Sequence, residues 1–343
     1  MIDFGQFSRA PDPDPKTTLL VNGEPSGEAV GYHLSPRESP DLTAAIDVAV
    51  GLGRPLLVTG EPGSGKTTLG YAVARRLGIE RAYLFVTKST SEARDLFYSY
   101  DALGRFRDAQ AQKAAEPGDY LAYQALGAAI LDAHDPGQIA HLSVGRSHGW
   151  APPEKPCRSL VVIDEIDKAS RDFANDILVE IEKLQFSVPE LTAQGDGIRR
   201  VRGSPPFPDP ALRPVVVVTS NAERPLPDAF LRRCVYVEAK FPDDALLRAI
   251  LRTTLNRRIG TGWDDADGGS AAGRIEDLLF KVKVFRDDPA VTKKPGLAEV
   301  IDAATVLAAP AGGRDPWGMV AATLAKTRED RAVWAARLAG TAG

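Results

Sequence analysis

The sequence has little of several features that mark secreted, membrane-bound or nucleic-acid-binding proteins. Only two of its 343 residues are cysteines, Cys157 and Cys234, and they stand far apart, so neither a disulfide framework nor a cysteine metal site is indicated. No apolar run approaches the roughly 20 residues that a membrane helix needs. The opening residues MIDFGQFSRAPDPDP carry acids and prolines where a signal peptide needs a basic start and an apolar stretch. We therefore expect a cytoplasmic protein without a membrane partner.

Charge and composition narrow the class further. The net charge of −4 gives the chain no general attraction to nucleic acid, so any basic surface has to be local. With 43% hydrophobic and 26% charged residues the composition is that of an ordinary globular protein. The length is sufficient for one large α/β unit and a smaller one.

Apolar runs separated by helical segments predict the fold class. Each run is short and continuous rather than alternating, which is typical of parallel strands buried on both faces. The predicted strands are RPLLVTG, RAYLFVTK, RSLVVIDEID and RPVVVVTSN, starting at residues 54, 81, 158 and 213. The residues between the first two strands, KTTLGYAVARRLG, have apolar positions at helical spacing. We expect an α/β protein with a three-layer αβα core around a parallel sheet.

The remaining segments suggest how the chain is divided. Residues 1–40 are rich in Pro, Asp, Gly and Ser and are expected to form an N-terminal extension. Residues 41–241 form the predicted core, with insertions at 88–157 and 190–210. From residue 242 to residue 343 the strand signal fades, which predicts a smaller all-α domain. Its predicted helices are DDALLRAILRTTLNRRI, IEDLLFKVKVF, LAEVIDAATVLAA and KTREDRAVWAARLAG.

The stretch GEPGSGKT fits the pattern G-x-x-x-x-G-K-[ST] and stands between a predicted strand and a predicted helix. Glycines let the backbone wrap a phosphate so that successive N–H groups point inward, and the following helix directs its positive end to the same place. Lysine adds a full charge, and a threonine hydroxyl suits Mg²⁺. The predicted nucleotide-binding residues are Gly60, Glu61, Pro62, Gly63, Ser64, Gly65, Lys66, Thr67 and Thr68.

A pair of carboxylates follows the third predicted strand, in LVVIDEID. An acid at the carboxyl end of a parallel strand lies at the sheet edge where α/β proteins bind ligands. Asp164 is therefore predicted to hold Mg²⁺ together with Thr67. Glu165 is predicted to polarise an attacking water. The alternative is that Asp164, Glu165 and Asp167 cap the next helix.

On these motifs the chain resembles the AAA+ ATPases and, within them, the MoxR-like group, over about residues 40–310. GEPGSGKT matches the Walker A motif and VVIDEID the Walker B motif. The resemblance implies that Asn221 is the polar residue called sensor 1. It also implies that Arg233, or its neighbour Arg232, is the arginine finger, which reaches the nucleotide of the next subunit in a homo-oligomeric ring, usually a hexamer.

The lid of the family often carries a further arginine, called sensor 2, and here the sequence departs from the pattern. The matching region reads VTKKPGLAEVIDAA, where Lys293 and Lys294 are the cations. Either lysine supplies a point charge but lacks the bidentate hydrogen-bonding geometry of a guanidinium, and we take Lys294 as the candidate nucleotide contact.

Two further segments resemble pore-facing insertions of the family. The second contains Arg199, Arg200 and Arg202, for which a solvated loop is the alternative.

The resemblance implies Mg²⁺-dependent ATP hydrolysis by a ring that remodels or activates a protein partner, as a chaperone does. MoxR-like proteins often act with proteins that carry von Willebrand factor A domains, and such a partner would be a separate chain. One alternative is a nucleotide-switched signalling or scaffold module with slow turnover. Another is a nucleic-acid-associated motor, which the acidic net charge disfavours. GTP in place of ATP stays open, since no residue was identified that reads the base.

Overall fold

The computed structural model describes residues 3–13, 18–26, 32, 39–113, 116–142, 150–195, 198–259, 270–309 and 315–339. The chain divides into two compact units. The first consists of Met1–Val30, Leu34–Thr59 and Lys66–Glu238, and the second of Gly31–His33, Gly60–Gly65 and Ala239–Gly343. The loop that joins the first predicted strand to its helix thus belongs to the second unit.

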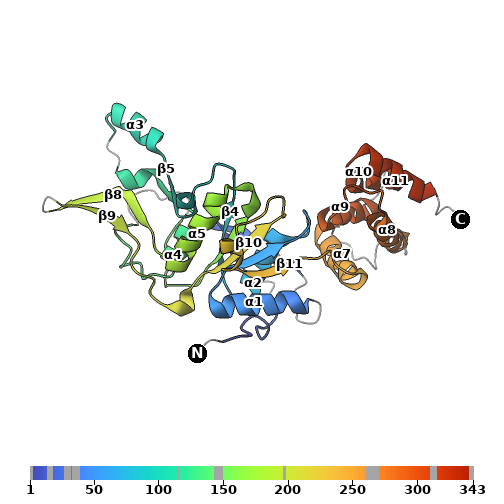
Figure 1. Cartoon of the computed structure of the whole chain (residues 1–343), viewed down its shortest axis with the longest axis horizontal. Coiled ribbons are helices and arrows are strands. Elements are labelled where there is room, and N and C mark those ends of the chain that lie inside the picture. The colour runs from blue at the N-terminus through green and yellow to red at the C-terminus, as the bar shows by residue number, and fades with distance from the viewer. Residues whose placement is uncertain are drawn as a thin grey trace. The chain divides into compact units, whose positions relative to one another are not determined.

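A seven-stranded sheet forms the centre of the first unit (Figure 1). Its strands, in spatial order, are β11 (Val235–Glu238), β3 (Leu56–Thr59), β10 (Val215–Ser220), β7 (Leu160–Asp164), β4 (Arg81–Val86), β1 (Leu19–Val21) and β2 (Glu24–Ser26). All neighbours are parallel except β1 and β2. The four apolar runs predicted as strands are confirmed as β3, β4, β7 and β10, which lie side by side.

Helices cover both faces of this sheet, as the continuous apolar runs predict. Figure 1 shows α1 (Pro40–Leu52) and α2 (Lys66–Arg76) on one side, and α4 (Ala125–Asp132) and α5 (Arg171–Lys183) on the other. Val161 and Ile163 belong to the same buried cluster as residues of α4 and α5. Val162 faces α2, where a Cβ on Gly70 would lie 2.6 Å from its side chain. Residues of β7 are therefore buried alternately on its two faces, which is the three-layer αβα arrangement.

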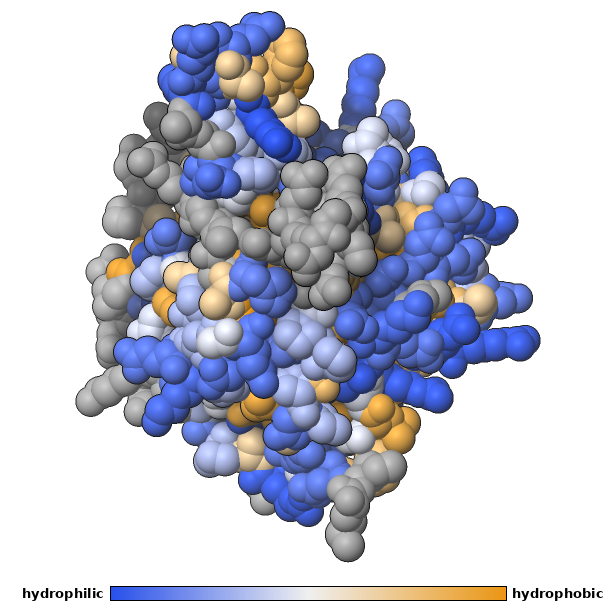
Figure 2. Space-filling model, turned by 90° about the vertical axis from the view of Figure 1, so that its left-hand side faces the viewer, coloured by the Kyte–Doolittle hydropathy of each residue, from blue (hydrophilic) through white to orange (hydrophobic). Residues whose placement is uncertain are grey.

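The insertions of the first unit form two small antiparallel sheets at one end (Figure 1). The first insertion contains η1 (Ala93–Leu96), β5 (Tyr98–Tyr100), α3 (Ala102–Gln110), η2 (Pro117–Tyr120) and β6 (Leu121–Tyr123). The second is the hairpin of β8 (Ser187–Gly195) and β9 (Ile198–Gly203), whose arginines at 199, 200 and 202 have side chains outside the described part. On α3, Leu103 is 74% and Phe106 61% exposed. Figure 2 looks onto this end, with hydrophobic residues beside hydrophilic ones over α3 at the top.

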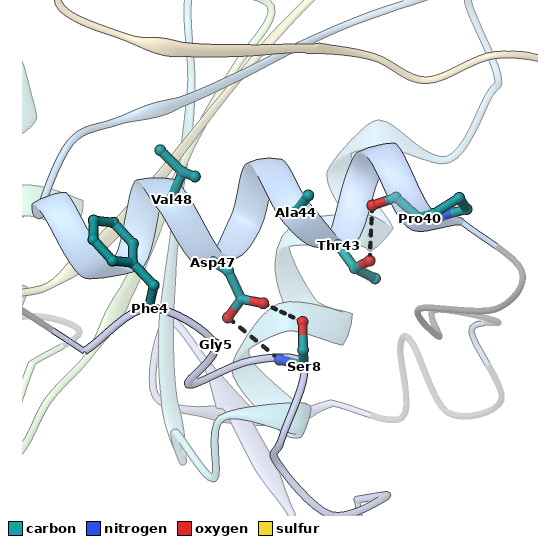
Figure 3. A pocket seen from close by; sticks show the side chains of 8 residues that line it. All are labelled: Phe4, Gly5, Ser8, Pro40, Thr43, Ala44, Asp47 and Val48. Carbon is teal, nitrogen blue, oxygen red and sulfur yellow. Dashed lines mark hydrogen bonds between the residues drawn. The ribbon is translucent and has the colours of Figure 1, made fainter.

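The N-terminal residues are more ordered than the expected extension. β1 and β2 form a hairpin whose turn, Asn22–Gly23, has φ of 50° and 84°, and β1 pairs with β4. Further towards the N-terminus, Asp47 of α1 accepts hydrogen bonds from the backbone N–H and the hydroxyl of Ser8 (Figure 3). It also accepts one from the backbone N–H of Phe7. Phe7 is fully buried. Residues 3–26 therefore contribute a strand pair and an anchored segment to the first unit wherever they are described.

The remaining short elements of the first unit lie close to strand ends. They are η3 (Ile166–Lys168), η4 (Pro210–Leu212) and α6 (Asp228–Leu231). η3 follows β7 directly, and α6 comes between β10 and β11 in the chain.

The second unit is helical in its described C-terminal part. It contains α7 (Asp244–Ile259), α8 (Ser270–Asp287), α9 (Leu297–Ala308), α10 (Pro316–Leu324) and α11 (Arg328–Ala339). Leu251, Leu278, Val300 and Trp334 from four of these helices meet in one buried cluster. Asp330 of α11 accepts hydrogen bonds from the backbone of Thr292 and Lys293 and so fixes the turn before α9. In the part of the chain that the structure describes, no helix combines the length and apolar character needed to cross a membrane.

Candidate nucleotide site

The parallel register of β7 and β10 brings two sets of polar residues to one edge of the sheet. β7 ends at Asp164 and is followed by Glu165, while β10 carries Thr219 and is followed by Asn221. The two strands pair in parallel with Val218 opposite Ile163, so their carboxyl ends lie together. Carboxyl ends of parallel strands are where open α/β sheets bind ligands.

Asp164 lies between two threonine hydroxyls. Thr67 Oγ1, in the first turn of α2, donates a hydrogen bond to Asp164 Oδ1 at 2.9 Å. Thr219 Oγ1 donates to the same carboxylate oxygen. Thr219 was not among the predicted site residues. A carboxylate and a hydroxyl at this separation are oxygen ligands of the kind that Mg²⁺ takes, usually with waters and phosphate oxygens completing its shell.

Glu165 has a strained backbone and a side chain with two partners. Its φ of 56° and ψ of 48° lie in the left-handed region, which costs a residue with a Cβ on the order of 1 kcal/mol. Its N–H donates to Thr219 Oγ1 at 3.0 Å. Its carboxylate accepts from Lys168 Nζ and from Asn221 Nδ2, the latter at 3.5 Å. The Glu165 carboxylate raises the pKa of Lys168 above its usual value, because the pair favours the charged ammonium.

Asp167 holds the chain that carries Asn221. This buried carboxylate accepts from the backbone N–H of Asn221 at 3.3 Å and of Glu223 at 2.9 Å. For Asp167 the sequence suggested only the alternative of a helix cap, and it suggested no role for Lys168, although both stand within three residues of Glu165. Asp167 stands in the motif, but its partners lie in the segment that follows β10, and the sequence does not show that β10 is the neighbour of β7.

The loop Gly60–Gly65 has the backbone that its glycines predict. Gly63 and Gly65 have φ of 74° and 84°, where a side chain would be strained. A Cβ on Gly60 would lie 2.5 Å from the carbonyl oxygen of Ala239, so no larger residue fits there. Ser64 Oγ is buried and has no hydrogen-bond partner in the structure. A buried hydroxyl without a partner among the described residues, in a glycine loop that leads into the N-terminus of a helix, fits a phosphate-binding role.

Residues of the second unit contact this loop. Arg286 of α8 donates to Glu61 Oε2 at 2.8 Å, and the N–H of Ala298, in the first turn of α9, donates to the carbonyl of Gly63 at 3.1 Å. Lys293 and Lys294, the candidates for the sensor 2 position, are exposed in the turn before α9. Arg286 was not predicted, because it lies seven residues before Lys293 and outside the segment that resembles the sensor 2 region.

Tyr32 is a further neighbour of the loop that the sequence did not single out. Its ring lies 3.5 Å from the place that a Cβ on Gly65 would occupy, which is an ordinary van der Waals distance. Burial raises the pKa of Tyr32 to about 12. Tyr32 is a neutral neighbour of Gly65 near pH 7, as a tyrosine with its ordinary pKa would also be.

Arg232 and Arg233 lie at the carboxyl end of α6, and both side chains are exposed. The structure does not bring them to Asp164 or Glu165 within the described hydrogen bonds and ion pairs of this chain. Among the described residues, no group of three or more His, Cys, Asp or Glu side chains is placed to hold a metal ion by itself.

Comparisons with known proteins extend this description. The family model of the AAA domain (dynein-related subfamily) matches residues 55–234. A search of curated proteins found no match. Similar solved structures include a RuvB mutant from Thermotoga maritima, with 16% identity over 78% of this chain and 68% of that chain and a TM-score of 0.37.

Two further solved structures are similar to the same extent. PCH-2 from C. elegans has 15% identity over 86% of this chain and 66% of that chain, with a TM-score of 0.38. The AAA domain of FIGL-1 in complex with ADP has 17% identity over 88% of this chain and 76% of that chain, with a TM-score of 0.37. The family model covers more than half of the chain, including β3, β7, β10 and the loop after β3. The protein therefore belongs to the dynein-related subfamily of AAA domains and is an ATPase.

Proposed function

We propose that this chain is a Mg²⁺-dependent ATPase of the MoxR-like group, which works as a ring and remodels or activates a separate protein. The observation that carries the proposal is the hydrogen-bonded set at the ends of β7 and β10. In it Asp164 accepts from Thr67 and Thr219, and the carboxylate of Glu165 is held by Asn221 and Lys168. This set supplies oxygen ligands for a metal ion and, beside them, the Glu165 carboxylate held in an orientation in which it can act as a base.

Each residue has a distinct task in this proposal. Backbone N–H groups of the Gly60–Gly65 loop and the ammonium of Lys66 bind the phosphates, with Ser64 and Thr68 beside them. Thr67 and Asp164 hold Mg²⁺, which when bound neutralises charge that develops on the transferred phosphoryl group. Glu165 orients and deprotonates the attacking water, and Asn221, which can both donate and accept, holds that water in line.

The exposed arginines at the end of α6 support a ring. Arg233, with Arg232 as the near alternative, is proposed to stabilise the transition state in a neighbouring copy, because both are exposed and neither has a described contact to Asp164 or Glu165 of its own chain. A head-to-tail interface that closes on itself produces such a ring, which we propose to be a hexamer. The exposed Leu103 and Phe106 of α3 are proposed to contact the protein client, for which a partner with a von Willebrand factor A domain is the candidate.

The test is the steady-state release of phosphate by the purified chain with MgATP, together with nucleotide binding by calorimetry. Lys66→Ala should lose binding and turnover, whereas Lys155→Ala, which removes an exposed lysine away from the loop, should keep both. Chelation of Mg²⁺ should stop turnover of the wild type. A wild-type chain without affinity for any Mg-nucleotide, or a Lys66→Ala variant with normal turnover, would overturn the proposal.

A further inference from the structure

Glu61 places a negative charge in a loop that is proposed to bind a polyanion. The other residues of Gly60–Gly65 are glycines, a proline and a serine, so Glu61 is the acid of the loop. A carboxylate beside a triphosphate is repelled by it, and the repulsion is strongest where water is partly excluded. A functional loop with this residue therefore needs a means of compensating the charge.

Arg286 lies where its positive charge can compensate the carboxylate of Glu61. Its Nη2 donates to Glu61 Oε2 at 2.8 Å, and its Nη1 donates to the carbonyl of Pro295. The guanidinium carbon stands 3.8 Å from the centre of the Phe241 ring, and the side chain is only 12% exposed. A guanidinium fixed by two hydrogen bonds and an aromatic face has few other orientations, so its charge stays at Glu61.

The start of α9 holds the same loop from a second direction. Besides the bond from Ala298 N–H to the Gly63 carbonyl, Gly296 lies so close that a Cβ there would stand 2.5 Å from the carbonyl oxygen of Pro62. These contacts hold the backbone of Pro62 and Gly63, next to Glu61, against the start of α9. The Glu61 side chain is itself 48% exposed, so the ion pair with Arg286, rather than burial, orients its carboxylate.

We propose that Arg286 is a positioning residue for nucleotide binding, which acts by neutralising and orienting the carboxylate of Glu61 so that the loop accepts the phosphates of a nucleoside triphosphate. The inference rests on the proposed function of the loop. It differs from a packing role in one measurable respect. If charge compensation is the task, removing the charge of Glu61 also removes the need for Arg286.

The experiment measures the affinity for MgATP by calorimetry in Arg286→Gln, Glu61→Gln and the double variant. Arg286→Gln should bind about tenfold more weakly, the size expected for one partly screened charge pair. Glu61→Gln should bind more tightly than the wild type, because the carboxylate that repels the phosphates is gone while the charge of Arg286 stays. The double variant should return to within about twofold of the wild type, because the repulsive charge is gone.

Two controls make the result specific. Arg248→Gln removes an arginine of α7 that pairs with Glu276 at 2.9 Å and has no described contact to the loop. This variant should leave the affinity for MgATP unchanged. Arg286→Lys keeps the charge and should bind within about threefold of the wild type, with melting temperatures showing that each variant is folded.

Three results would overturn the inference. A double variant as weak as Arg286→Gln, or Arg286→Lys as weak as Arg286→Gln, would show that packing and not charge is the contribution of Arg286. Weaker MgATP binding by Arg248→Gln would show that the loss of any ion pair of the second unit has the same effect. If the wild type itself binds no Mg-nucleotide, the proposed function of the loop fails, and this outcome is separate because it does not depend on any variant.

Discussion

Thr67 and Asp164 are 97 residues apart in the sequence, yet the threonine hydroxyl donates a hydrogen bond to the aspartate carboxylate at 2.9 Å. One belongs to the first turn of α2 and the other to the end of β7. The two oxygens that are proposed to bind Mg²⁺ therefore already face each other. Because little rearrangement is needed, metal binding loses less free energy to ordering these side chains than it would with separated ligands.

The first prediction concerns Glu165. Glu165→Gln should bind MgATP normally and lose turnover by roughly 100-fold or more, because an amide cannot take a proton from water. Phosphate release and calorimetry measure the two effects separately. Asp172→Asn, which changes an exposed acid in the first turn of α5, is the matched control and should behave as the wild type. Normal hydrolysis by Glu165→Gln would assign the base to another residue.

The second prediction concerns Thr219, whose hydroxyl joins Asp164 to the N–H of Glu165. Thr219→Val keeps the shape but leaves that N–H without its acceptor, which costs about 1–3 kcal/mol for a buried group. We expect turnover to fall by about tenfold or more, since the left-handed conformation of Glu165 loses a support. Thr219→Ser restores the hydroxyl and should restore the rate. Equal rates in the valine and serine variants would show that the hydroxyl has no such task.

The third prediction separates Arg232 from Arg233. Arg233→Ala should bind MgATP as the wild type does and slow turnover by about 10³-fold, the usual size of an arginine-finger effect. Arg232→Ala should have a small effect. Mixing Arg233→Ala with inactive Lys66→Ala subunits should restore part of the activity, because each supplies what its neighbour lacks. A slow Arg232→Ala with a normal Arg233→Ala would exchange the two assignments, and no restoration on mixing would argue against a finger acting between copies.

The fourth prediction tests the packing of the fold with two glycines in helices. A Cβ on Gly127 of α4 would stand 2.0 Å from the backbone oxygen of Phe97, so Gly127→Ala should destabilise the chain by about 1–3 kcal/mol. Gly273 of α8 has nothing within 4 Å of that position, and Gly273→Ala should be neutral or stabilising by up to about 1 kcal/mol. Urea unfolding gives both values. Similar losses for the two variants would contradict the close contact at Gly127.

The central strands and the loop could be predicted because their signals are local. VVVVTS reads as a strand without reference to any neighbour, and all six of its residues are buried in β10. The left-handed glycines of the loop follow from its pattern in the same way. In the second unit the predicted helices are found as α7, α8, α9 and α11, whereas α10, whose nine residues begin with Pro316, gave too weak a pattern to be noticed.

The contacts around the site could not be predicted, because they depend on which strands are neighbours. Thr219 in the sequence is one polar residue at the end of an apolar run, and its role appears only when β10 lies beside β7. Arg286 likewise is one of several basic residues in its helix until α8 is placed beside the loop. One missed element did have a local signal. VNGE contains Asn-Gly, a strong signal for a two-residue hairpin, and it forms the turn between β1 and β2.

That hairpin has a practical consequence for anyone who shortens the protein. Leu20 N–H donates to the carbonyl of Glu80, and Asn22 both donates to the carbonyl of Ala82 and accepts from Leu84 N–H. A truncated chain starting at Ser39 would lack β1, so β4 would become an edge strand with unpaired backbone N–H and C=O groups. An exposed edge strand can pair with a strand of another molecule, so the shortened protein should aggregate at concentrations where the full chain does not.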